Sequence, residues 1–170
     1  MSIFPTKILL ATDGSEEAAL AAETAADIAR LSRSELHVVH VEGFSPYPLA
    51  AYSPSGYVDT ETMRTIVEER DSEARKILDE QVSRIEGSGG TVSSSYLRQG
   101  RPDREIVSLA EEIGAGLVVM GSRGLGGMRR ALLGSVSDSV VRHAHCPCLV
   151  VRKEEPEEEE EVGPADVGFV

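Results

Sequence analysis

Large aromatic side chains are scarce in this chain of 170 residues, which has no Trp and only 4% aromatic residues. A core without them must be built from Ala, Val, Leu and Ile. The content of 41% hydrophobic and 27% charged residues is ordinary for a soluble globular protein. Small side chains of this kind suit helices that pack closely on a sheet, and the length fits one domain.

Long apolar runs are also missing. No stretch approaches the roughly 18 apolar residues of a membrane helix. The first residues, MSIFPTKILLATDGS, lack the basic and apolar segments of a signal peptide. We therefore expect a cytoplasmic protein with no membrane partner.

A basic surface stripe is not expected, because the formal net charge is −12 and residues 153–170 account for −7 of it. Nucleic-acid binding depends on Lys and Arg that neutralise phosphates, so we expect no nucleic-acid partner. Residues 153–170 contain seven Glu and little apolar surface, which predicts a disordered acidic tail. Such a tail either interacts electrostatically with a partner or only improves solubility.

Cysteine is limited to Cys146 and Cys148, which flank a proline. A disulfide between residues so close together would be strained, so reduced thiols are expected. With His143 and His145 these thiols offer metal-ligand types, but structural zinc sites draw their ligands from two separated pairs. We expect packing at a strand start and no metal site.

Apolar runs alternate with helical patterns along residues 1–152. Strands are predicted at 6–13, 35–42, 91–100, 115–120 and 147–152, and helices at 15–32, 58–86, 102–114 and 135–143. Residues 43–57, with three prolines, are predicted to form an irregular loop. His37 and His40 alternate with apolar residues, which favours packing or edge exposure over catalysis.

This alternation predicts a single α/β domain with a doubly wound parallel sheet and helices on both faces. Ligands of such sheets bind beyond the carboxyl ends of the strands, where the winding reverses. The ends of the first, second and fourth strands carry Asp13, Val41 and Met120–Gly121. We expect a ligand site there.

The stretch GSRGLGGMRRALLGSVS, residues 121–137, has the spacing G-x-x-G, nine residues, then G-S. Glycines admit close backbone approach, and the free N–H groups of a following helix bind phosphate oxygens. Ser135 and Ser137 add hydroxyl donors. The alternative is a flexible surface loop, but a position after a strand and before a helix favours phosphate binding.

Charge distinguishes the two candidate helix starts. Glu16 and Glu17 open the first helix and would repel a triphosphate, whereas Arg123 and the arginines at 129 and 130 precede the last helix. Asp13 suits a sugar hydroxyl or a divalent cation, or it caps the first helix. The P-loop lysine pattern is missing, which favours nucleotide binding over fast hydrolysis.

Together these motifs resemble the ATP-binding class of the universal stress protein family. The resemblance rests on Asp13, HVVHVE at 37–42, VVMGSRG at 118–124, LLGSVSDSVVRHAHCPCLVV at 132–151 and the glycine spacing. It implies a universal stress protein domain over 1–152 with the strand order 3-2-1-4-5. It also implies ATP between strands one and four and a homodimer joined through about residues 147–152.

The resemblance further implies two sets of binding residues. The adenosine side takes Ala11, Thr12, Asp13, Val41, Met120 and Gly121. The phosphate side takes Arg123, Gly124, Gly134, Ser135, Val136 and Ser137.

The function that we expect is a homodimeric sensor or regulator of the stress response that binds ATP with Mg²⁺ or Mn²⁺ and acts on an unidentified protein partner. Two alternatives stay open. One is a slow ATPase or nucleotidyl-transferring enzyme on the same fold, and the other is a dimerisation module whose nucleotide site is vestigial.

Overall fold

The computed structural model describes residues 6–43, 59–124 and 133–153, and the structural statements below concern these residues. The loop expected at 43–57, except Gly43, lies outside them. So do residues 125–132 of the glycine-rich stretch and the acidic tail from residue 154.

A five-stranded parallel sheet forms the centre of the protein. Its strands are β1 (Lys7–Thr12), β2 (Glu35–Gly43), β3 (Ser94–Gly100), β4 (Leu117–Gly121) and β5 (Cys148–Val151). They lie in the order β3-β2-β1-β4-β5, which confirms the predicted order. β3 begins at Ser94, later than expected, and the residue before it is bonded to β2, because the Ser93 N–H donates to the Leu36 carbonyl.

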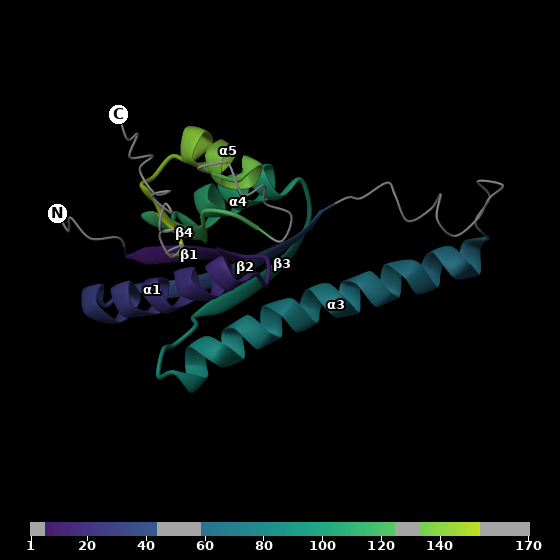
Figure 1. Ribbon diagram of the computed structural model, residues 1–170, viewed down its shortest axis with the longest axis horizontal. Helices are drawn as coiled ribbons and strands as arrows, with labels where there is room; N and C mark the ends of the chain where they lie inside the picture. The colour runs from purple at the N-terminus through teal and green to yellow at the C-terminus, as the bar shows by residue number, and fades with distance from the viewer. Residues whose placement is uncertain (1–5, 44–58, 125–132, 154–170) are drawn as a thin grey trace, which may run out of the picture.

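Helices cover both faces of the sheet, as the doubly wound fold predicts. α1 (Glu16–Ser32) and α3 (Thr60–Gly87) lie on one face, and α4 (Pro102–Ile113) and α5 (Ser135–His143) on the other (Figure 1). Ser15 caps α1, because its hydroxyl accepts the Ala18 N–H.

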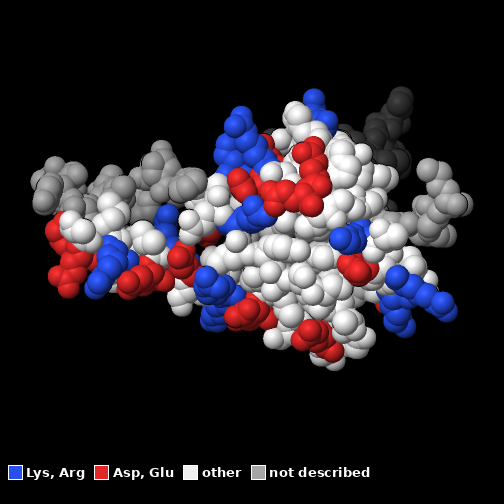
Figure 2. Space-filling model, turned by 180° about the vertical axis from the view of Figure 1, so that it is seen from behind, with Lys and Arg blue, Asp and Glu red and all other residues white. Residues whose placement is uncertain are grey.

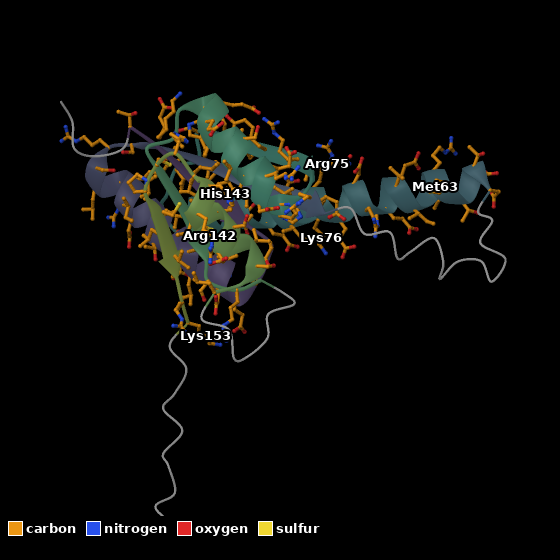
Figure 3. The ribbon with its side chains drawn as sticks, turned by 90° about the horizontal axis from the view of Figure 1, so that it is seen from above. Met63, Arg75, Lys76, Arg142, His143 and Lys153 are labelled. Carbon is orange, nitrogen blue, oxygen red and sulfur yellow. The ribbon has the colours of Figure 1, made fainter. Side chains whose placement is uncertain are left out.

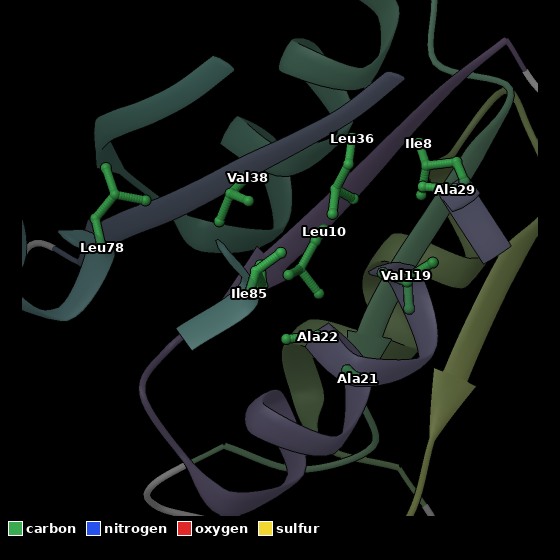
Figure 4. Packing of buried hydrophobic residues seen from close by; sticks show 11 residues of the cluster. Ile8, Leu10, Ala21, Ala22, Ala29, Leu36, Val38, Leu78, Ile85 and Val119 are labelled. Carbon is green, nitrogen blue, oxygen red and sulfur yellow. The ribbon is translucent and has the colours of Figure 1, made fainter. Parts of the chain in front are cut away.

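Successive side chains of a strand point to opposite faces of the sheet, so the core has two layers. Ile8 and Leu10 face α1 and α3, whereas Leu9 and Ala11 face α4 and α5. Figure 4 shows the first layer, in which Ala21 and its neighbours in α1 lie close to Leu10. The alanine-rich sequence of α1 therefore serves a close helix-to-sheet contact, which large side chains would prevent.

Only part of α3 packs on the sheet. Its buried residues, Ala74, Leu78, Gln81 and Ile85, belong to the C-terminal half. The N-terminal half, with Met63 near its end, extends beyond the sheet (Figures 1 and 3). Because α3 is antiparallel to the strands, this extension lies on the side of the molecule where the strands end.

Two histidines lie inside β2. His37 and His40 are each 5% exposed, which confirms the packing alternative. His37 stacks on the ring of Tyr96, and His40 Nδ1 bonds to the Thr12 carbonyl at 2.8 Å. The second contact connects β2 to the end of β1, where the candidate site begins.

Candidate functional site

A cavity of about 520 Å³ opens at the carboxyl ends of β1, β2 and β4. Every residue that the sequence predicted for the site lines it. These residues are Ala11, Thr12, Asp13, Val41, Met120, Gly121, Arg123, Gly124, Gly134, Ser135, Val136 and Ser137. The fold therefore brings together segments that are up to 126 positions apart in the sequence, as expected where a parallel sheet reverses its winding.

Much of the cavity wall is apolar. Val41 and Met120 contribute to it, together with residues that sequence reasoning missed, namely Ala18, Val39, Pro102, Ile106 and Leu133. The sequence could have predicted Val39, because side chains alternate along a strand and Val39 therefore lies on the same face of β2 as Val41. No local signal marks Pro102 or Ile106, because α4 reaches the cavity only through its packing on the sheet. This apolar lining suits a flat, weakly polar ring.

The turn between β1 and α1 is held by buried side chains. The Thr12 hydroxyl donates to Gln81 Oε1 at 3.0 Å and accepts the Gly14 N–H at 3.3 Å. Asp13 Oδ1 accepts the Ser15 N–H at 3.0 Å, so this carboxylate holds the turn, while the Ser15 hydroxyl caps the helix. These bonds fix the direction in which Asp13 presents its carboxylate to the cavity.

The first turn of α5 forms the polar end of the cavity. Gly134 is its N-cap, and the first helical bond runs from the Asp138 N–H to the Gly134 carbonyl. The N–H groups of the next three residues therefore have no acceptor within the helix. Together with the helix dipole, they favour an anion.

The two serines of this turn differ in what their hydroxyls can do. Ser137 is 6% exposed, and its hydroxyl donates to the Gly121 carbonyl at 2.9 Å. Its single proton is therefore used inside the fold, although its backbone lines the cavity. Ser135 is exposed at the cavity wall and retains a hydroxyl that can reach a ligand.

Two glycines, one at the end of β4 and one after it, permit close approaches. A Cβ at Gly121 would stand 2.9 Å from Glu17 Cβ and 3.0 Å from the Glu17 backbone carbon. A Cβ at Gly124 would overlap Asp13 Oδ2. The glycine motif thus lets the loop after β4 lie directly on the β1–α1 turn.

Charges of both signs surround the cavity. Among the described residues that line it, Arg123 is the only cation and Asp13 the only carboxylate. At the surface, Lys153 donates to Glu16 and holds the pKa of that carboxyl below its ordinary value. Elsewhere, acidic and basic side chains are interspersed on the face seen in Figure 2.

The histidines and cysteines near β5 lie apart from this cavity. His143 Nδ1 bonds to the Ser139 carbonyl at 2.7 Å, within α5. Cys146 and Cys148 are half-buried, and burial raises the pKa of both thiols. Within residues 6–43, 59–124 and 133–153, no three His, Cys, Asp or Glu side chains are grouped to hold a metal ion.

The helices of the described part of the chain are also too short or too polar to cross a membrane. The longest, α3, has a charged residue at many of its positions.

Two curated relatives resemble the chain over most of their length. A universal stress protein of Methanocaldococcus jannaschii is 35% identical, with 89% of this chain and 84% of the relative covered. One of Bacillus subtilis is 34% identical, with 86% of this chain and 98% of the relative covered.

Solved structures share the fold. UspA from Lactobacillus plantarum has a TM-score of 0.71 at 24% identity, over 89% of this chain and all of its own. A universal stress protein in complex with cAMP has a TM-score of 0.61 at 27% identity, over 88% and 98%. One from Archaeoglobus fulgidus in complex with dAMP has a TM-score of 0.60 at 25% identity, over 88% and 99%.

The family model agrees with these likenesses. The model of the universal stress protein family matches residues 5–152, which is nearly the whole chain before the acidic tail. The chain therefore belongs to the universal stress protein family.

Proposed function

We propose that the chain binds ATP in the cavity between β1 and β4 and acts as a nucleotide-dependent sensor or regulator of a stress response in the cytoplasm. The observation that carries this proposal is the convergence of all twelve predicted residues on one cavity, whose lining combines apolar side chains with the N-terminus of α5. Relatives of known structure hold adenine nucleotides, cAMP in one case and dAMP in another.

The cavity offers a suitable environment for each part of the ligand. The adenine ring would lie between Val41 of β2 and Met120 of β4, which are apolar and both line the cavity. The phosphates would accept from the N–H groups at the start of α5 and from the Ser135 hydroxyl.

Asp13 lines the same cavity, beside Gly124. Its carboxylate would accept from a ribose hydroxyl or, with the phosphates, hold Mg²⁺ or Mn²⁺, which prefer oxygen ligands. A bound divalent cation would offset the negative charge of the triphosphate.

A homodimer joined through β5 belongs to the same proposal. β5 is the last strand of the sheet and pairs with β4 alone among the described strands. The carbonyls of Pro147 and Val151 accept N–H groups from β4 and from the residue that follows it. Alternation then directs the N–H and C=O groups of Cys148 and Val150 to the open edge. A second copy of β5 would pair there, and nucleotide occupancy would alter the dimer or its contact with a protein partner.

Thermal unfolding with and without ATP and Mg²⁺ tests the proposal. At about 100 times its dissociation constant, a ligand stabilises the folded state by about 2.7 kcal/mol. For a chain of this size the melting temperature should rise by about 5 to 10 °C. Ser135→Asp should abolish this rise, because it places a carboxylate among the phosphates. Ser83→Asp, on an exposed position of α3, is the matched control and should retain it.

Identical melting curves of the native chain with and without millimolar ATP would contradict the proposal and favour a vestigial site. A Ser135→Asp variant that keeps the full rise would place the nucleotide elsewhere. Repeated release of ADP or AMP by the purified chain would favour the enzyme alternative.

A further inference from the structure

The Glu17 carboxylate joins two parts of the site that are far apart in the sequence. Glu17 lies in the first turn of α1, and its Oε2 accepts two hydrogen bonds from the loop after β4. The Ser122 hydroxyl and the Arg123 N–H are the donors, each at 2.6 Å. Hydrogen bonds to an ionised acceptor are short and stronger than those between neutral groups. Sequence reasoning gave Glu17 only the role of repelling phosphate.

Ser122 extends this connection to the other end of the glycine motif. Its side chain is fully buried, and its N–H donates to the Val151 carbonyl at 2.8 Å. Its own carbonyl accepts the Gly134 N–H at 2.7 Å, and the Ser137 hydroxyl at 3.2 Å. A continuous path of hydrogen bonds therefore runs from Glu17 through Ser122 to the N-cap of α5.

This path also decides which backbone amides are left for a ligand. The N–H groups of Arg123 and Gly134 are used within the fold. The N–H groups at the first turn of α5, which begins directly after Gly134, are not bonded within the helix. Their position relative to Asp13 is set by the path, because Gly124 lies against Asp13 and Gly134 is bonded to Ser122.

We propose that Glu17 is a positioning residue of the phosphate site, which holds Ser122, Arg123 and the start of α5 in the geometry that binds phosphate before the ligand arrives. The inference rests on the proposed function, because it assigns phosphate to that end of the cavity. Groups that are already held in their binding positions avoid the cost of being ordered when the ligand binds. The effect should therefore be confined to ligands that carry phosphate.

Three substitutions separate the hydrogen bonds of Glu17 from its charge. Glu17→Leu removes both, whereas Glu17→Gln keeps an oxygen acceptor and removes the charge. Glu16→Leu is the matched control. Glu16 belongs to the same helical turn and carries the same charge, but it is exposed and bonds to Lys153, labelled in Figure 3.

Calorimetry with adenosine, AMP and ATP in the presence of Mg²⁺ gives the first measurement. Glu17→Leu should weaken AMP and ATP binding by about tenfold or more, the equivalent of one hydrogen bond to a charged group. Its affinity for adenosine should stay within about twofold of the native value. Glu17→Gln should recover most of the loss, and Glu16→Leu should bind all three ligands as the native chain does.

Hydrogen exchange of the ligand-free proteins gives the second measurement. The Arg123 and Gly134 amides should exchange faster in Glu17→Leu than in the native chain, and at the native rate in Glu16→Leu. If Glu17→Leu does not fold, Ser122→Ala takes its place. It removes one of the two donors and should weaken ATP binding by about three- to tenfold.

The inference is overturned if Glu17→Leu binds ATP as the native chain does, or if adenosine affinity falls as much as ATP affinity. Unchanged exchange of both amides would also overturn it. The proposed function fails separately, if the native chain binds none of the three ligands. In that case faster exchange in Glu17→Leu would still establish the path from Glu17 to α5.

Discussion

Gly124→Ala should separate nucleotide binding from folding. Gly124 does not have a positive φ, so the backbone there accepts an alanine. The new methyl group would overlap Asp13 Oδ2, and the carboxylate would have to retreat by about 1 Å to reach ordinary contact distance. Asp13 Oδ1, which accepts the Ser15 N–H at 3.0 Å, would move with it.

The expected loss is that of one hydrogen bond to a charged group, about 1.5 to 3 kcal/mol, or a 10- to 100-fold weaker binding of ATP with Mg²⁺. Calorimetry measures it. The melting temperature of the ligand-free protein should fall less than in Gly121→Ala, because the end of a side chain moves and the backbone does not.

Gly121→Ala provides the contrast. Its methyl group would meet the backbone carbon of Glu17 at 3.0 Å, which a rotation of a side chain cannot relieve. We expect this variant to lose about 1 to 3 kcal/mol of unfolding free energy, as overpacked sites do. Native ATP affinity in Gly124→Ala, or a larger loss of stability in Gly124→Ala than in Gly121→Ala, would refute the reasoning.

Two further predictions concern the dimer and the contact between α4 and α5. Val150→Pro removes an N–H that faces the open edge of β5 and should yield monomers in sedimentation experiments. Val150→Thr keeps the N–H and should not, and dimers in both variants would exclude this edge. Burial alone would raise the pKa of Asp103, but hydrogen bonds from Ser139 and Arg101 and the charge of Arg101 lower it overall. A carboxyl group whose pKa is lowered by folding stabilises the folded state at pH values above its ordinary pKa of about 3.9. This stabilisation decreases as the pH falls below that value. The free energy of unfolding of Asp103→Asn, measured by urea titration at neutral pH, should therefore be about 1 kcal/mol lower than that of the native chain. This difference should shrink below about pH 4, and a constant difference would show that the charge is not involved.

Much of the fold was predictable because its signals are local. Alternating apolar runs and helical patterns locate the strands and helices, and the preference for right-handed crossovers restricts their order. The glycine spacing marks the phosphate end of the cavity, because glycine permits contacts such as that between Gly124 and Asp13. The family resemblance supplied the strand order and the full residue set, which composition and periodicity alone do not specify.

Other parts of the site depend on packing and carry no local signal. Pro102 and Ile106 complete the apolar wall only because α4 crosses the sheet above β2 and β1. Ser137 has the same side chain as Ser135, yet burial directs its hydroxyl to the Gly121 carbonyl.

The sequence by itself determined the alternation of strands and helices, the small-residue face of α1 and the glycine motif at one end of the cavity. These features follow from the polarity and size of neighbouring side chains. The tertiary structure decided the role of Glu17, whose carboxylate meets a loop 105 residues away. It also decided where α3 leaves the sheet (Figure 1). Such contacts between distant segments depend on how the layers of the fold pack. The residues on either side of Glu17 therefore do not predict them.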